Sequence, residues 1–300
     1  MRIRRPASLA ALALAAACAR AAPPAAAPQP APDATTWDSI AAVLRTPAVP
    51  AAGYVRYNLP RRDFTVRMAG ATLAVPLAAG AWAGFAGSAA KAMVMGDLVL
   101  TQAELGPVQA VLLRQGIDVT AVHSHLVGEE PRLAFVHFHG EGPALDLARR
   151  LDSAIARTAT RRPIAAAAAP PVTIDTALVF GVLGRPGRAQ GSVAQLAPML
   201  VKGTVRWHGR AQVPALACAS TIALQAVNPG RAVATGELAL LAPQLEPVLR
   251  ALAAHGIVVE ALHTHMAGEQ PPVYFVHFWA DGTLAEVVRG LRAALDAARP

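Results

Sequence analysis

The chain has 300 residues, of which 54% are hydrophobic and only 15% are charged. Apolar content this high excludes a mostly disordered protein, and no uninterrupted apolar run reaches the roughly 20 residues that a membrane-spanning helix needs. The formal net charge is +8, but the arginines beyond the first five residues form no basic block, so a nucleic-acid partner is not expected.

Residues 1–18 have the pattern of a bacterial signal peptide. A basic start is followed by an apolar stretch from Leu9 to Cys18 that is too short to span a bilayer. The small residues before Cys18 resemble a lipobox, in which the cysteine receives lipid, although Ala15 stands where leucine is commonest. Cleavage after Ala21 is the alternative. We therefore expect an exported protein, either periplasmic or held at the membrane only through a lipid anchor.

The sequence beyond this segment contains two copies of one unit. GDLVLTQAEL at 96–105 matches GELALLAPQL at 236–245, an offset of 236 − 96 = 140 residues, and GIDVTAVHSHLVGEEP at 116–131 matches GIVVEALHTHMAGEQP at 256–271. Repeats of this kind indicate a duplicated domain. The predicted organisation is a signal peptide (1–18), a Pro/Ala-rich tether (19–36), repeat 1 (37–160), a linker (161–171) and repeat 2 (172–298).

Within repeat 1, short strands or hairpin elements are expected over residues 64–87, then a strand over 92–100. A helix follows, with Pro107 in its first turn and Gly116 just past its end. Two strands, 117–126 and 132–139, are joined by a turn, and a helix with an apolar stripe from Leu145 to Ile155 comes last. Repeat 2 has the same order. The predicted fold class is α+β: two tandem copies of a mixed, largely antiparallel sheet with helices packed on one face.

Histidine provides the strongest chemical signal in the sequence. Seven of the nine histidines lie in two matching windows: His123, His125, His137 and His139, and then His263, His265 and His277. Because side chains alternate along a strand, the odd-numbered residues are expected to form one face that carries all the imidazoles. A turn centred near residue 130 would place His123 opposite His137. The even-numbered face, with Val122, Leu126, Val136 and Phe138, is expected in the core.

Three imidazoles converging from paired strands match the ligand preference of zinc or another borderline transition metal. Glu129 and Glu269, in the hairpin turns, could add a carboxylate or accept a hydrogen bond from a ligand, although turn residues are often only solvated. The alternative is that the histidines stack across the strands or line the interface between the copies without a metal.

Other candidate residues are weaker. Asp97 and Glu237 occupy equivalent positions after a glycine, and Glu141 and Asp281 are also equivalent. Turn-forming and capping roles are favoured for these four acids. The segment Pro60-Arg61-Arg62-Asp63 could bind an anion but is missing from repeat 2. The aromatic residues Tyr54, Tyr57 and Trp82 could form a platform for sugar but more often belong to a core.

The chain resembles the LppY/LpqO family of exported bacterial proteins and lipoproteins, which is built on a domain of unknown function. The resemblance covers both repeats and is clearest in GIDVTAVHSHLVGEEPRLAFVHFHG (116–140) and GIVVEALHTHMAGEQPPVYFVHFWADG (256–282). The family usually has asparagine between the first two histidines, where this chain has Ser124 and Thr264. The resemblance implies export and a histidine hairpin, and it implies no activity.

Two functions remain in competition. The first is a non-catalytic envelope protein that binds a metal, a cell-wall glycan or a small molecule, and it is favoured because no nucleophile–base pair is recognisable. The second is a metal-dependent enzyme in which His123, His125, His137 and the matching trio hold an ion that activates water. The duplication allows either two sites or one site shared at a pseudo-twofold interface.

Overall fold

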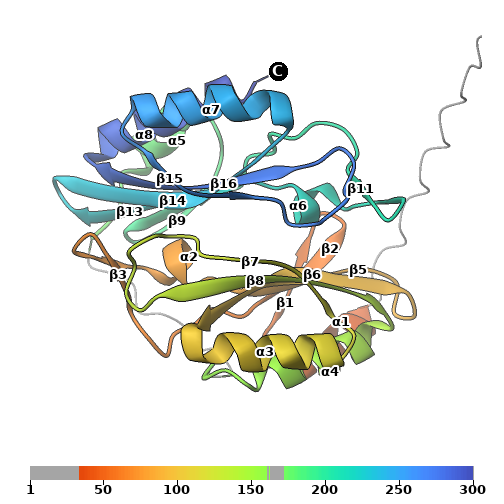
Figure 1. The fold of residues 1–300 in the computed structure, drawn as a ribbon. Coiled ribbons are helices and arrows are strands. Elements are labelled where there is room, and N and C mark those ends of the chain that lie inside the picture. Colours follow the sequence, from red (N-terminus) through yellow and green to blue (C-terminus); the bar gives the residue numbers. More distant parts are fainter. Residues whose placement is uncertain (1–33, 161, 163–171, 300) are drawn as a thin grey trace, which may run out of the picture.

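The computed structural model describes residues 34–160, 162 and 172–299. The predicted signal peptide, the predicted lipidation site at Cys18, most of the tether and nearly all of the linker lie outside the described residues. The two repeats form two α+β units with the same order of elements (Figure 1). No helix among the described residues is both long and apolar enough to cross a membrane.

Repeat 1 contains a six-stranded antiparallel sheet with the order β1-β2-β5-β6-β8-β7. Its strands are β1 (Ala48–Ala51), β2 (Tyr54–Asn58), β5 (Trp82–Gly87), β6 (Ala92–Thr101), β7 (Asp118–His123) and β8 (Leu133–Gly142). A small hairpin and four helices complete the repeat: β3 (Val66–Met68), β4 (Ala71–Leu73), α1 (Ala34–Leu44), α2 (Val75–Ala78), α3 (Gln102–Arg114) and α4 (Ala144–Ile155).

Repeat 2 has the equivalent antiparallel sheet in the order β15-β16-β14-β13-β10-β9. Its strands are β9 (Arg188–Gln190), β10 (Val193–Leu196), β13 (Thr221–Asn228), β14 (Arg231–Leu240), β15 (Val258–His263) and β16 (Tyr274–Gly282). The remaining elements are β11 (Arg206–Trp207), β12 (Arg210–Ala211), α5 (Thr176–Leu183), α6 (Pro214–Ala217), α7 (Ala242–Ala254) and α8 (Leu284–Ala297). The predicted α+β class with two tandem, largely antiparallel repeats is confirmed.

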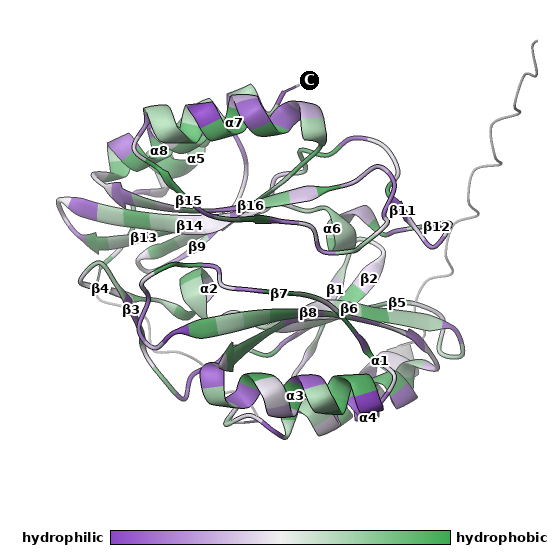
Figure 2. Ribbon diagram, in the orientation of Figure 1, coloured by the Kyte–Doolittle hydropathy of each residue, from purple (hydrophilic) through white to green (hydrophobic). Residues whose placement is uncertain are grey.

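The long helices cover only the outer face of each sheet (Figure 1). Helices α3 and α7 carry both hydrophilic and hydrophobic residues, as expected for helices with one face in solvent (Figure 2). In α4, Leu147, Leu151 and Ile155 are buried, and the same stripe recurs in α8 at Val288, Leu291 and Leu295. The inner faces of the two sheets are turned toward each other, so the molecule has helix, sheet, sheet and helix layers.

Each repeat sends a short segment into the space between the sheets. Helix α2 of repeat 1 packs against β13 and β14 of repeat 2, and α6 occupies the equivalent place on repeat 1 (Figure 1). The side chain of Gln225 joins the repeats, because its Nε2 donates to the Thr72 carbonyl at 2.9 Å and its Oε1 accepts from the Ala74 amide at 2.8 Å. The repeats therefore share a continuous, packed interface.

Two local expectations are wrong. Helix α3 begins at Gln102, so Pro107 lies inside the helix rather than in its first turn. The start is fixed by the capping interaction of the Thr101 amide with the Glu104 carboxylate at 2.9 Å. Val122 is 44% exposed instead of buried, although Leu126, Val136 and Phe138 of the same predicted face are in the core.

Candidate metal centre

The histidine hairpins are paired in a register that differs from the expected one. His123 lies opposite Phe135 and Ala121 lies opposite His137, so the pairing is centred at residue (123 + 135)/2 = 129 and not at 130. A β-bulge between Val119 and Ala121 changes the register only farther from the turn. Repeat 2 has the same bulge, with His263 opposite Phe275. The shift from the expected pairing is two residues, and a shift by an even number keeps each side chain on its own face.

The two histidine faces meet across the interface between the repeats. The ring centroids of His123 and His263 are 3.7 Å apart, so these two equivalent residues are neighbours near a pseudo-twofold axis. His125 stacks on His277 at 4.0 Å, and His137 stacks on His265 at 3.8 Å. The six imidazoles therefore form one centre made of three pairs, and every pair takes one ring from each repeat.

Phenylalanine rings at the strand ends fix two of these imidazoles. The ring of His125 stacks on Phe135 and that of His265 stacks on Phe275, each with centroids 3.3 Å apart. Both histidines lie just beyond the ends of β7 and β15, where no ladder hydrogen bond positions them. Stacking supplies that order, and it leaves the ring nitrogen atoms free to face the centre.

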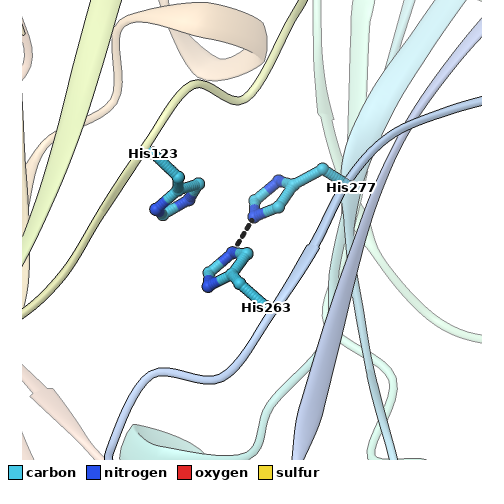
Figure 3. Close-up of side chains that lie close together, drawn as sticks. All are labelled: His123, His263 and His277. Carbon is cyan, nitrogen blue, oxygen red and sulfur yellow. Dashed lines mark hydrogen bonds between the residues drawn. The ribbon is translucent and has the colours of Figure 1, made fainter.

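Two groups of three imidazoles could hold a metal ion. The first is His123, His125 and His137, and the second is His123, His263 and His277. Within each group the ligand atoms lie within 4.8 Å of one another. Figure 3 shows the second group, in which the Nε2 atoms of His277 and His263 are 3.0 Å apart. An ion between three such nitrogens would have the ligands that zinc and related metals prefer.

Asp97 and Glu237 lie beside the imidazoles and not in turns, which corrects the expectation from sequence. Asp97 on β6 is paired with His137, and its Oδ2 is 3.6 Å from His125 Nε2. Glu237 on β14 is paired with His277, and its Oε2 is 3.5 Å from His265 Nε2. The glycine-acid pattern in each repeat was the signal that could have placed them here.

The glycine before each of these acids has a structural reason. A Cβ atom on Gly96 would lie 2.2 Å from the carbonyl oxygen of Trp82, and one on Gly236 would lie 2.0 Å from that of Thr221. Both contacts are with the backbone of the neighbouring strand. Any larger residue would push the strands apart next to the centre, so glycine is required at both places.

Burial and mutual repulsion lower the pKa of five of the six imidazoles. Burial, together with the nearby His263 and His265, lowers the pKa of His123 to about 2. Burial likewise lowers the pKa of His263 to about 4 and holds those of His125, His137 and His277 well below their ordinary values. Neutral imidazole is the form that binds metal, so these five rings are in their ligand form at neutral pH. Burial, with the charge of Glu237, raises the pKa of Asp97.

His139 and the turn glutamates lie outside the two trios. His139 is buried against the edge of Trp207 from repeat 2, with ring centroids 4.3 Å apart. Glu129 and Glu269 are only 2% exposed, and each accepts a hydrogen bond at 3.1 Å within its own turn, from the amides of Leu133 and Val273. Burial raises the pKa of each carboxyl to about 7. A metal-ligating role for these three residues stays a prediction.

The other candidates have structural roles. The guanidinium of Arg61, 1% exposed, donates to Asp63, to Glu104 and to the Val99 carbonyl, which uses its donors within the fold. Tyr57 is fully buried and donates to the Trp37 carbonyl, so it cannot stack on a sugar. Glu141 and Asp281 form ion pairs with Arg210 and Arg231.

A family model described as "Domain of Unknown Function (DUF1259)" matches residues 38–157 and, a second time, residues 178–297. The two matches span most of the chain, so the protein belongs to this family and contains its domain twice. The narrower LppY/LpqO assignment stays a prediction. No curated protein matches the chain significantly.

Two solved structures have weak similarity to the chain. A fused permuted hexameric shell protein of the RMM microcompartment is 17% identical, and the alignment covers 69% of this chain and 84% of that one with a TM-score of 0.20. A double ringed trimeric shell protein of the same microcompartment is 15% identical, with 69% and 82% covered and a TM-score of 0.20. Scores this low carry no argument about this protein.

Proposed function

We propose that this protein binds a transition metal ion at a histidine centre formed jointly by its two repeats. The observation that carries the proposal is a set of seven buried side-chain atoms without a hydrogen-bond partner among the described residues. They are both ring nitrogens of His123, the Nε2 atoms of His125, His137 and His265, Asp97 Oδ1 and Glu237 Oε2.

Unpartnered polar atoms of this kind are costly. Each costs about 1–3 kcal/mol of desolvation when nothing replaces its water, and folded proteins rarely gather several in one place. Stacking against Phe135 and Phe275 satisfies the faces of the rings but not their nitrogens. A bound cation would satisfy nitrogens and carboxylates together, so a metal explains the cluster better than stacking alone.

The spacing of the rings favours an ion over an organic ligand in this centre. Ring centroids of facing histidines are 3.7 to 4.0 Å apart, which is van der Waals contact. A sugar could enter only by separating the repeats, whereas an ion sits between nitrogen atoms. Imidazole ligands suit zinc, copper, nickel and iron, and the donor set does not distinguish among them.

Elemental analysis tests the proposal. The full chain, purified without a polyhistidine tag and without chelator, should carry stoichiometric metal, and a His123→Ala, His263→Ala double variant should carry none. His255→Ala, at the C-cap of α7 and outside both trios, is the matched control and should keep the metal. Wild-type protein free of metal after incubation with zinc, copper, nickel and iron salts would refute the proposal.

A metal-dependent enzyme is the second candidate, and the position of Asp97 favours it. Its carboxyl is 6% exposed, unpartnered at Oδ1 and 3.6 Å from His125, which is itself 19% exposed at the outer side of the centre. Such a carboxyl could exchange a proton with a water molecule on the ion. An Asp97→Asn variant would then keep its metal and lose turnover in a screen for hydrolysis or oxidation.

The proposed setting is the cell envelope, with export directed by residues 1–18 and either lipid on Cys18 or free release. Cell fractionation of the wild type and a Cys18→Ala variant distinguishes these two forms. The proposed outer partner is a cell-wall glycan or a small molecule that binds outside the histidine centre. Co-sedimentation with purified sacculi that is unaffected by chelator and by the His123→Ala, His263→Ala variant would support this partner, and no co-sedimentation would exclude the glycan.

A further inference from the structure

We infer that the centre holds two metal ions, with His123 as a ligand shared by both. This inference rests on the metal site proposed above and adds the number of ions and the way in which they are connected. The first ion takes His123, His125 and His137, and the second takes His123, His263 and His277.

The number of donors is the first argument. Six imidazoles and two carboxylates belong to the cluster, whereas zinc in proteins usually takes four ligands. Among the described residues the nitrogen atoms gather in two groups of three, and no larger group fits within the same distance. One ion could therefore satisfy only part of the cluster, whereas two ions use five of the six imidazoles.

The position of His123 is the second argument. Its ring lies between its own repeat's His125 and His137, at 4.9 and 5.0 Å, and the opposite repeat's His263 and His277, at 3.7 and 5.0 Å. Both of its nitrogen atoms are buried and have no hydrogen-bond partner. In a neutral imidazole one nitrogen carries a proton and the other accepts. If the second ion displaces that proton to solvent, each nitrogen can bind one ion.

Each trio has one carboxylate beside it, Asp97 for the first and Glu237 for the second. Asp97 lies 3.6 Å from His125 of the first trio, and Glu237 lies 3.7 Å from His277 of the second. A carboxylate beside a ligating histidine orients the ring and offsets the charge of the ion. One carboxylate per trio suits two divalent cations sharing an anionic imidazolate, and it leaves His265 beside Glu237 as a partner of that acid.

The stoichiometry of zinc separates this inference from the function on which it rests. Chelator-treated full chain, incubated with excess zinc and desalted, should retain two ions per chain. His125→Ala and His277→Ala should each retain one, and His123→Ala should retain less than one because both trios lose a ligand. His255→Ala is the control and should retain two. Circular dichroism of each variant shows whether the fold is kept, and His123→Gln replaces His123→Ala if that variant does not fold.

Copper provides an independent test of the shared ligand. Two Cu²⁺ ions joined through one imidazole are magnetically coupled, so the wild type loaded with two Cu²⁺ ions should show a diminished resonance for isolated Cu²⁺. The His125→Ala variant loaded with one Cu²⁺ should show the full uncoupled signal. A wild-type chain that binds only one zinc ion overturns the two-ion inference and leaves the metal site standing. Two uncoupled copper ions overturn the shared ligand, and a chain that binds no metal overturns both proposals.

Discussion

The two repeats differ in the aromatic contacts beside the histidine centre. The histidine strand β8 of repeat 1 carries His139, whereas repeat 2 has Trp279 at the equivalent position, 140 residues later. The opposing hairpins differ in a complementary way. Trp207 of β11 packs on His139, while the equivalent Met68 of β3 belongs to the same apolar cluster as Trp279. A tryptophan is present at both places, Trp207 in one and Trp279 in the other, and the residue at the opposing position is smaller. The substitutions in the two repeats therefore compensate for each other.

The centre itself has remained nearly symmetric. His123 and His263, His125 and His265, and His137 and His277 are equivalent, and the two cross-repeat stacks differ by only 4.0 against 3.8 Å. The visible difference is within the repeats, because His263 and His277 are hydrogen-bonded while His123 and His137 only stack, at 5.0 Å. The six histidines otherwise keep the same arrangement in both repeats. The neighbouring contacts, of His139 with Trp207 and of Trp279 with the core of repeat 1, are made by different residues.

Replacing the indole that joins the repeats should have the largest effect on stability. Trp279 is 6% exposed and packs into the core of repeat 1, so Trp279→Ala removes a large apolar surface and leaves a cavity. We expect a loss of about 3–5 kcal/mol in the free energy of unfolding. Urea denaturation of chelator-treated protein, followed by circular dichroism, measures it.

His139→Ala is the matched variant on the other side of the pseudo-twofold axis. It removes a smaller ring and also a buried Nε2 atom without a partner, which offsets part of the lost packing. We therefore expect a loss of less than about 2 kcal/mol. Equal losses of unfolding free energy in Trp279→Ala and His139→Ala would contradict the expectation that the indole contributes more packing than the imidazole.

Acid should destabilise the metal-free protein by protonating the histidines of the centre. His123 and His263, with folded pKa values of about 2 and about 4, titrate near 6.5 when unfolded. A lowered pKa means that the unfolded chain binds more protons below pH 6.5, so stability is complete above that pH and falls as the pH decreases toward the folded values. From pH 7 to pH 5 we expect a loss of about 2–4 kcal/mol from these two groups.

Urea denaturation at the two pH values measures this loss. A His123→Gln, His263→Gln variant should show a smaller pH dependence, because glutamine does not titrate, and His255→Gln should behave like the wild type. Bound zinc should steepen the dependence further, since protons compete with the ion for the ring nitrogens. Stability that is independent of pH would mean that the rings are not held neutral.

Much of the fold could be predicted because each sequence pattern that indicates a strand or a helix occurs in both repeats. The offset of 140 residues, the alternation in the histidine strands and the apolar stripe from Leu145 to Ile155 each occur twice. The face of the imidazoles was also predictable. The register was wrong by two residues because the pairing is centred at residue 129 and not at 130, but an even shift leaves the face unchanged.

A site shared between the two repeats was one alternative offered by the sequence, but the sequence could not decide between it and two separate sites. Nothing in the spacing of His123 and His263 indicates that they lie 3.7 Å apart, since that contact depends on how two sheets dock. Docking is decided by long-range contacts such as Gln225 with Thr72 and Ala74. Asp97 and Glu237 were judged as turn residues for the same reason, because their neighbours come from other strands and from the opposite repeat.

The contact of Gln225 with repeat 1 has no polar counterpart in the other direction. Removing it should lower the free energy of unfolding by less than the changes above. The equivalent position in repeat 1 is Ala86, which belongs to the apolar cluster with Leu216, so one contact is polar and the other is not. Gln225→Ala leaves the Ala74 amide and the Thr72 carbonyl without this partner. We expect a loss of about 1–2 kcal/mol. Gln190→Ala, at an exposed position in β9, is the control in the same urea experiment and should be neutral.

The exposed ion pair between the repeats should matter least. Arg210 Nη1 is 2.6 Å from Glu141 Oε2, but the two side chains are 71% and 42% exposed, so water and salt screen the attraction. Arg210→Ala should cost at most about 0.5 kcal/mol in the free energy of unfolding. A double-mutant cycle with Glu141→Gln at low and at high salt measures the coupling of the pair alone. A coupling above about 1 kcal/mol that persists in high salt would show that water and salt do not screen this pair, and that the surface charges add to the packing of Trp207 and Trp279.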